Sequence, residues 1–285
     1  MKHIFIMNMS KKNQDFEKHI HHIMKGYHYQ IIHTHSSQEV SSHIEKLQEP
    51  SRIYAVGGDG TLNSVIQSIV NTEHVCVPIP LGTGNDFCRM LMKEKDPVIF
   101  LKESLHYSSQ KIDVIQVNDR YCLNSACFGV DSVIANHVHD TMKIRWIPES
   151  KSYIIGILKH VFAYSFDETT IYENDRCLYK GPITLCTFNN GPYYGGGFPI
   201  IPHADIQDGY IDLCVVDQVP KAKMPYLITL LLRKKLKQRK EVHYFQVKEA
   251  IVYTKQKGNL DGDEYQADHY HIRIHPSSLN MVIYR

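Results

Sequence analysis

A glycine-rich turn between an apolar strand and an amphipathic helix constrains this chain more than any other feature. The turn is Gly57-Gly58-Asp59-Gly60, and the apolar residues 53–56 precede it. Apolar side chains then recur at i, i+3, i+4, i+7 and i+8, at Leu62, Val65, Ile66, Ile69 and Val70. A strand, a tight turn and a helix in this order predict a βα unit of a parallel sheet.

The same alternation runs through the first ~115 residues. Strands are expected at 4–7, 30–33, 53–56 and 75–79, with helical segments between them. This order favours a mostly parallel, Rossmann-like sheet covered by helices. We therefore predict a nucleotide-binding α/β domain over residues 1–115.

Beyond residue 115 the pattern changes to short strands around turns. Strand pairs are expected around Asn118-Asp119-Arg120 and Asn174-Asp175-Arg176. Further strands are expected at 183–188, 210–216, 243–254 and 269–275, and helices at 150–165 and 220–238. The prediction is an antiparallel β-sandwich domain over residues 116–275, with 276–285 packing back onto the first domain. The active site would lie in the cleft between the domains.

Composition limits the classes of function. The chain has 285 residues and a net charge of +2, so bulk electrostatics give no reason to expect a nucleic-acid partner. Seven Cys without a C-x-x-C pair indicate reduced thiols and a cytoplasmic protein. The N-terminal apolar stretch is too short for a signal peptide. The longest apolar run, 227–232, is far shorter than the ~20 residues of a membrane span, so membrane association would be peripheral.

A second glycine loop, Gly82-Thr83-Gly84-Asn85-Asp86, follows the strand expected at 75–79. Ligands bind at the carboxyl ends of parallel strands, where both loops would lie. Neither loop has the Lys of a phosphate-binding P-loop. Each loop alone would also suit a tight turn with an Asp or Asn helix cap. A carboxylate beside phosphate would call for a divalent cation between them, and Mg²⁺ is a hard ion suited to that role.

The ordered motifs resemble the diacylglycerol kinase catalytic-domain family, which includes bacterial lipid kinases and the sphingosine and ceramide kinases. The resemblance begins with GGDGTLNSVI (57–66) and PLGTGNDFCR (80–89). It continues with KIDV (111–114), NNGPYYGGGFPIIPHADIQDGYIDLCVV (189–216) and LDGDEY (260–265). G-G-D-G also recurs, more distantly, in NAD kinases. The chain departs from the family at Asn8-Met9-Ser10-Lys11-Lys12, where the family often has Asn-Pro-x-Ser-Gly.

The resemblance implies roles for individual residues. Nucleotide contacts would come from Gly57, Gly58, Gly60, Thr61, Asn63, Gly82, Thr83 and Asn85. Asp59, Asp86 and Asp113 would hold Mg²⁺ beside the phosphates, and Asp59 would thereby take part in catalysis. Asp261 would be the general base, with either Asp263 or Glu264 as a second acid. Asp205, Asp208 and the carbonyl of Tyr210 would bind a structural metal.

These roles imply a lipid kinase that uses ATP and Mg²⁺ and transfers the γ-phosphoryl group to a lipid hydroxyl. The substrate expected first is diacylglycerol, which would become phosphatidic acid. Another lipid alcohol, such as phosphatidylglycerol, undecaprenol or a long-chain base, remains an alternative, as does a catalytically silent binding protein. The expected partner is a lipid at the membrane surface, and a homodimer is left open as an alternative to a monomer. The basic stretch 233–241 would either meet an anionic membrane or form a solvated helix face.

Overall fold

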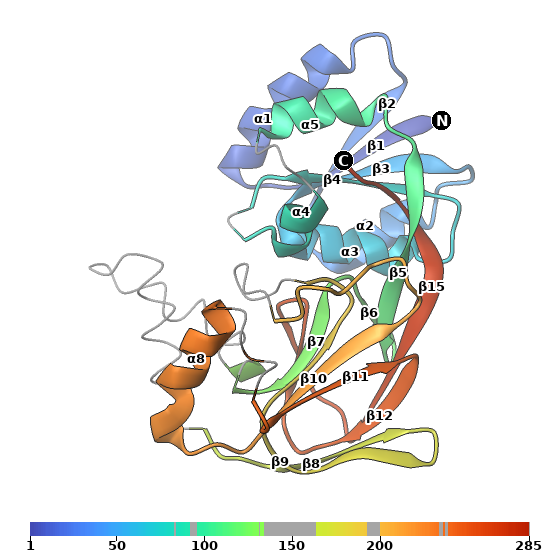
Figure 1. Ribbon diagram of the computed structural model, residues 1–285. Helices are drawn as coiled ribbons and strands as arrows, with labels where there is room; N and C mark the ends of the chain where they lie inside the picture. Colours follow the sequence, from blue (N-terminus) through green and yellow to red (C-terminus); the bar gives the residue numbers. More distant parts are fainter. Residues whose placement is uncertain are drawn as a thin grey trace. The chain divides into compact units, whose positions relative to one another are not determined.

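The computed structural model (Figure 1) divides the chain into two compact units. It describes residues 1–82, 84–91, 96–130, 132–133, 164–192, 200–233, 236 and 239–284, without the side chains of Lys11, Asp86, Pro225, Ile228, Leu231 and Leu232. The first unit comprises Met1–Val114, Ile206–Gly209 and His275–Arg285. The second comprises Ile115–Asp205 and Tyr210–Ile274. The helix expected at 150–165 lies almost entirely outside the described residues.

A parallel sheet forms the centre of the first unit. Its strands are β1 (Lys2–Asn8), β2 (Tyr29–Thr34), β3 (Ser51–Gly57), β4 (Val75–Pro80) and the end of β15 (Tyr270–Val282). Their order is β15-β4-β3-β1-β2, and every neighbouring pair is parallel. The four strands expected in this region are confirmed.

Helices cover both faces of this sheet. They are α1 (Lys11–Ile23), α2 (Ser37–Ile44), α3 (Asp59–Ile69), α4 (Asp86–Leu91) and α5 (Pro97–Ser104). Figure 1 shows α1 and α5 on one face and α2 and α3 on the other. The apolar stripe predicted for α3 is buried, and α3 begins at Asp59, two residues after the end of β3.

The second unit is an antiparallel β-sandwich. One sheet contains β6 (Arg120–Cys122), β5 (Ser109–Val117), β15, β12 (Glu249–Tyr253), β8 (Glu168–Glu173) and the first half of β9 (Arg176–Asn189). The other contains β14 (Asp263–Tyr265), β13 (Gly258–Leu260), β7 (Ser125–Gly129), the second half of β9, β10 (Ile211–Asp217) and β11 (Val242–Val247). Side chains from both sheets, among them Ile171, Phe188 and Tyr270, form one buried core.

The structure corrects three expectations for this unit. The strand predicted at 243–254 is two strands, β11 and β12, which pair with different neighbours on either side of Lys248. The strand predicted at 183–188 is the second half of the longer β9. The helix predicted at 220–238 is shorter and begins as a 3₁₀ turn, Lys221–Lys223, followed by α8 (Met224–Leu232). Among the described residues, no helix is long and apolar enough to cross a membrane.

Candidate active site

The two glycine loops of the first unit lie directly against each other. The carbonyl of Gly57 accepts hydrogen bonds from the backbone N–H of Leu81 at 2.7 Å and of Gly82 at 3.2 Å. A Cβ placed on Gly82 would lie only 2.6 Å from the Cα of Gly58. A side chain at residue 82 would therefore push the loops apart, which explains the glycine there.

Asp59 begins α3 and faces the second loop. A Cβ placed on Gly84 would lie 3.0 Å from its Oδ2 atom. A carboxylate in the first turn of a helix interacts favourably with the helix dipole, which gives Asp59 a structural reason to be there. Burial, followed by the charge of Asp59, raises the pKa of the Cys88 thiol well above its usual value. Asp59 thus has an uncharged thiol near it at neutral pH.

Asn85 contributes a buried acceptor at the same place. Its backbone has a φ of 53°, a left-handed conformation that Asn tolerates better than most residues. Its Nδ2 atom donates to the carbonyl of Gly82 at 2.7 Å. Its Oδ1 atom is buried without a hydrogen-bond partner among the described residues. A buried acceptor of this kind suits a donor from a ligand, such as a hydroxyl group or a metal-bound water.

Thr61 and Asn63, also expected to contact nucleotide, lie in the first two turns of α3. The Thr61 side chain occupies the space beside Gly57, where a Cβ would lie 2.3 Å from Oγ1. Asn63 is buried, and its Oδ1 atom accepts a hydrogen bond from Gln67 at 2.6 Å. A Cβ on Gly60 would meet no atom of the described residues within 4 Å beyond its chain neighbours and its own helix backbone. Thr83 lies outside the described residues, and so does the side chain of Asp86.

Lys12 is a cation near these loops that the sequence analysis did not single out. Its Nζ atom donates to the carbonyl of Leu81 at 2.5 Å, across 69 residues of sequence. The sequence offered one signal for Lys12: it lies in the segment 8–12, where the chain departs from the family motif. In the same segment, the side chain of Ser10 caps α1 by accepting from the N–H of Asn13. The Oδ1 atom of Asn8 accepts from the Nδ2 of Asn13 at 2.7 Å.

Asp113 lies in β5 and is 1% exposed. Its Oδ2 atom accepts from the N–H of Gly209 and its Oδ1 atom from the N–H of Ser277, each at 2.7 Å. Its own N–H donates to the carbonyl of Ile206 at 2.7 Å. Within the first unit, Asp113 therefore joins three chain segments through backbone hydrogen bonds. Its expected role as a Mg²⁺ ligand stays a prediction.

The residues of the structural-metal motif are divided between the two units. Asp208 belongs to the first unit, whereas Asp205 and Tyr210 belong to the second. Gln207 between them donates from Nε2 to the carbonyl of Lys111 at 2.7 Å, within the first unit. In the described parts of the chain, no three His, Cys, Asp or Glu side chains cluster as metal ligands. The motif offers two carboxylates and one carbonyl, so its metal also stays a prediction.

Asp261 occupies the turn between β13 and β14 in the second unit. Its φ is 49° and that of Gly262 is 103°, the positive values of a tight Asp-Gly hairpin turn. Its Oδ2 atom accepts from the N–H of Leu123 at 2.5 Å. Its Oδ1 atom accepts from the N–H groups of Asn124 at 3.0 Å and Ser125 at 2.8 Å. Three N–H donors fix the carboxylate in position and stabilise its ionised form.

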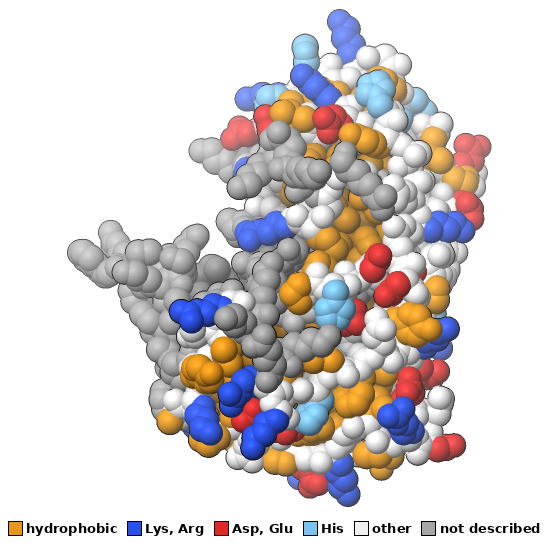
Figure 2. All heavy atoms as spheres, viewed as in Figure 1, with side chains coloured by type: hydrophobic (Ala, Val, Ile, Leu, Met, Phe, Trp, Pro, Cys, Tyr) orange, Lys and Arg blue, Asp and Glu red, His pale blue; other side chains and the backbone are white. Residues whose placement is uncertain are grey.

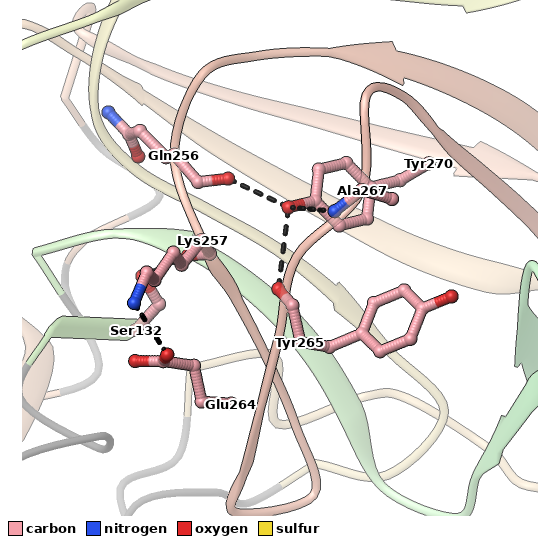
Figure 3. A network of polar contacts seen from close by, with 7 residues as sticks. All are labelled: Ser132, Gln256, Lys257, Glu264, Tyr265, Ala267 and Tyr270. Carbon is pink, nitrogen blue, oxygen red and sulfur yellow. Dashed lines mark hydrogen bonds and ion pairs between the residues drawn. The ribbon is translucent and has the colours of Figure 1, made fainter.

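Polar contacts also hold the rest of this hairpin (Figure 3). The Nζ atom of Lys257 lies 2.7 Å from Oε1 of Glu264. The hydroxyl of Tyr270 donates to the carbonyl of Gln256 at 2.8 Å. Burial, and then the charges of Asp261 and Asp263, raise the pKa of the Cys122 thiol. Both carboxylates therefore act on the same buried thiol, while Glu264 forms an ion pair with a lysine.

Two models of known protein families match this chain, one in each half. The family model for the diacylglycerol kinase catalytic domain matches residues 2–117. The YegS C-terminal NAD kinase beta sandwich-like domain matches residues 124–283. The chain belongs to the diacylglycerol kinase family of lipid kinases. The resemblance read from the ordered motifs is thereby confirmed.

Relatives agree with this placement. A diacylglycerol kinase from Staphylococcus saprophyticus is 27% identical over 216 residues, 74% of this chain and 70% of the relative. A protein from Enterobacter sp. named "Probable lipid kinase YegS-like" is 25% identical over 260 residues, 88% of this chain and 85% of the relative. The kinase class follows from the family; the substrate of this chain does not.

Solved structures share the fold. A diacylglycerol kinase from Bacillus anthracis has a TM-score of 0.75 at 18% identity, covering 99% of this chain and 96% of that one. An NAD kinase from Archaeoglobus fulgidus in complex with ATP has a TM-score of 0.58 at 12% identity, covering 100% and 94%. The predicted fold class, a parallel α/β domain followed by an antiparallel sandwich, is confirmed.

Proposed function

We propose that this chain transfers the γ-phosphoryl group of ATP to the hydroxyl of diacylglycerol and so makes phosphatidic acid. The observation that carries the proposal is the contact between the two glycine loops, where Gly82 approaches the Cα of Gly58 and Asp59 faces Gly84. Backbone without side chains allows phosphate oxygens to come close, and a helix N-terminus favours their negative charge. Family membership narrows the reaction to a lipid kinase.

The donor set of the first unit fits a nucleotide with Mg²⁺. The buried Oδ1 of Asn85 accepts from no described residue and suits a ribose hydroxyl or a metal-bound water. Lys12 Nζ lies at the carbonyl of Leu81, next to Gly82, and offers a positive charge for phosphate. Asp59 and Asp86 would hold Mg²⁺, a hard cation that prefers carboxylate and water oxygens. Bound there, Mg²⁺ would neutralise the charge that develops on the transferred group.

Asp261 is assigned to the acceptor hydroxyl. Phosphoryl transfer requires a group that orients the attacking oxygen and accepts its proton. The three N–H donors from Leu123, Asn124 and Ser125 hold this carboxylate in one orientation. This fixed orientation suits Asp261 to orienting the attacking hydroxyl and accepting its proton during the transfer.

A lipid panel with mass-spectrometric identification of products tests the proposal. The purified chain is incubated with labelled ATP and Mg²⁺ in neutral detergent micelles that contain one lipid each: diacylglycerol, phosphatidylglycerol, undecaprenol or sphingosine. Phosphatidic acid should form from diacylglycerol, and the Asp59→Asn variant should form almost none. Preferential phosphorylation of another lipid would replace the proposed substrate. Labelling of no lipid by a folded protein that binds ATP would favour the silent binding protein.

A further inference from the structure

Positive charge is concentrated in one segment of this nearly neutral chain. Residues 218–240 contain eight Lys and Arg and no Asp or Glu. The whole chain has 32 basic and 30 acidic residues, so outside this segment 24 basic residues face 30 acidic ones. This segment is therefore positively charged, whereas the rest of the chain has a net negative charge.

The structure shows how this segment is anchored in the second unit. Met224 and Leu227 of α8 are 4% and 9% exposed, and with Leu236 they join a buried apolar cluster. The helix is thus held by one face, and that face is occupied by the protein's own core.

The opposite face of α8 combines an aromatic ring with basic side chains. Tyr226 is 51% exposed, and Thr229 and Arg233 follow it at i+3 and i+7, both exposed. The guanidinium of Arg239 lies 5.6 Å from the centre of the Tyr226 ring and also pairs with Glu241 at 3.2 Å. Figure 2 shows Lys and Arg side chains gathered beside hydrophobic ones in the region of α8.

We propose that this face of α8, with Tyr226, Arg233 and the flanking Lys221, Lys223 and Lys240, docks the protein on an anionic lipid bilayer. Tyrosine prefers the membrane interface because its ring is apolar and its hydroxyl is polar. Because the apolar face of α8 packs in the core, its exposed basic face would meet the lipid head groups, with the Tyr226 ring at the interface. Each basic residue near an anionic surface strengthens binding roughly fivefold. The exposed Tyr226 ring, which suits the membrane interface, favours a bilayer over nucleic acid.

The inference rests on the proposed function for its purpose, since a kinase of membrane lipids must reach its substrate. Binding can nevertheless be measured without turnover, by flotation with vesicles of phosphatidylcholine alone or mixed with phosphatidylglycerol. A patch variant and a control variant each lose four exposed or partly exposed positive charges and so have equal net charge. The patch variant is K221Q/K223Q/R233Q/K240Q, and the control variant is K18Q/K25Q/R176Q/K180Q.

The wild type and the control variant should bind the mixed vesicles similarly and the phosphatidylcholine vesicles weakly. The patch variant should bind the mixed vesicles on the order of 10²-fold more weakly and lose most of the salt dependence. Tyr226→Ala should weaken binding several-fold and leave the salt dependence intact, whereas Tyr226→Phe should bind nearly as the wild type does. Thermal unfolding midpoints like that of the wild type would show that the variants are folded.

Three results would overturn the proposal. One is equal binding of mixed vesicles by the patch and control variants. Another is equal loss in both, which would make net charge the cause. The third is a patch-dependent preference for duplex DNA over the mixed vesicles. If docking depends on the patch but no lipid is phosphorylated in detergent micelles, the docking face stands and the proposed function fails. If diacylglycerol is phosphorylated normally in micelles but the wild type does not dock on vesicles, the proposed function stands and the docking face fails.

Discussion

The Cα of Gly58 and the position where a Cβ of residue 82 would stand are 2.6 Å apart. Gly58 is the N-cap of α3, and Gly82 follows the neighbouring strand β4. The Oδ1 atom of Asn85 would lie 2.8 Å from the same Cβ. Backbone and a buried side-chain atom thus enclose residue 82, so a side chain there would have to displace one of them.

Gly82→Ala should therefore lower stability by about 1–3 kcal/mol, the usual range for overpacking, and weaken nucleotide binding at least tenfold. Gly60→Ala is the matched control, because among the described residues no atom beyond its chain neighbours and its own helix backbone would lie within 4 Å of its Cβ, and residue 60 is in α3. Alanine favours a helix, so this control should be as stable as the wild type or more stable by up to about 1 kcal/mol. Urea unfolding measures both variants. Equal midpoints for the two would contradict the enclosure of Gly82.

Sequence periodicity located most of the first unit because its signals are local. The alternation of apolar runs and helical stripes located four strands and the buried face of α3. Helix α5 was not predicted, although Asp96 caps it through the N–H of Val98 and Pro97 occupies its first turn. That capping pattern was available in the sequence.

In the second unit, partners distant in sequence decide where strands begin and end. Strand-favouring residues lie on both sides of Lys248, with no turn sequence between them, yet β11 pairs with β10 and β12 with β8 and β15. Strand β9 pairs with β8 in its first half and with β10 in its second. No local pattern indicates such an exchange of partners. The Asp261-Gly262 hairpin, by contrast, had a recognisable turn sequence that was used only for its motif.

The candidate site shows the same limit. The glycine loops were found because Gly and Asp cluster after predicted strands. The backbone contacts of Asp113 were not, because they span 96 residues to Gly209 and 164 to Ser277. Motif resemblance gave Asp113 an expected role as a Mg²⁺ ligand, but it did not indicate that both carboxylate oxygens accept backbone hydrogen bonds. Only the structure identifies these two partners.

The lowered pKa of His3 predicts that the protein loses stability in mild acid. Burial, then the charges of Arg52 and of the N-terminus, lower the pKa of His3 from 6.5 to about 4. Between these values the unfolded chain binds a proton at His3 that the folded chain does not bind. Stability should therefore fall as the pH decreases from 6.5 towards 4, by about 2 kcal/mol from this residue at pH 5.

Urea unfolding at pH 7 and pH 5 checks this contribution. His3→Gln removes the titrating group, so the variant should lose about 2 kcal/mol less than the wild type between the two pH values. His19→Gln, on the exposed side of α1, is the control and should follow the wild type. An identical pH dependence for His3→Gln and the wild type would show that His3 does not cause the loss.

The motif around Asp208 predicts a structural cation. If Asp205, Asp208 and the Tyr210 carbonyl bind Mg²⁺ or Ca²⁺, a chelator should lower the thermal midpoint of the wild type, because a bound ion stabilises only the folded state. Asp208→Ala should unfold at a thermal midpoint below that of the metal-bound wild type, whether or not chelator is present. Asp268→Ala, an exposed acid outside the motif, should respond to the chelator as the wild type does. A chelator without effect on the wild type would remove the structural metal.

Asp59 is expected to act through Mg²⁺ and nucleotide. Asp59→Asn keeps the shape of the side chain and removes its charge, so Mg²⁺-dependent binding of an ATP analogue should weaken at least tenfold and turnover should fall with it. Calorimetric titration with and without Mg²⁺ measures the effect. Asp15→Asn, an exposed acid on α1, should bind as the wild type does. Unchanged binding and turnover in Asp59→Asn would leave Asp59 as a residue of the turn alone.

Asp261 should give the opposite pattern. Asp261→Asn should leave Mg²⁺–ATP affinity within a few fold and lower kcat by roughly 10²–10⁴, the usual range for general base catalysis. Asparagine has one oxygen where the carboxylate has two, so at least one of the three N–H groups of Leu123, Asn124 and Ser125 would lose its acceptor. We therefore expect a stability loss of about 1–3 kcal/mol as well.

These two effects of Asp261→Asn must be separated before its role is assigned. Turnover is measured well below the unfolding midpoint of the variant, so that the folded fraction is nearly complete, and Asp268→Asn serves as the control for lost charge. A folded Asp261→Asn with near-normal kcat would end its assignment as the base. The stability loss alone would then define Asp261 as the residue that holds the segment 123–125 against the β13–β14 turn. A large loss of kcat in the folded variant, with nucleotide affinity kept, would place its function on the lipid hydroxyl.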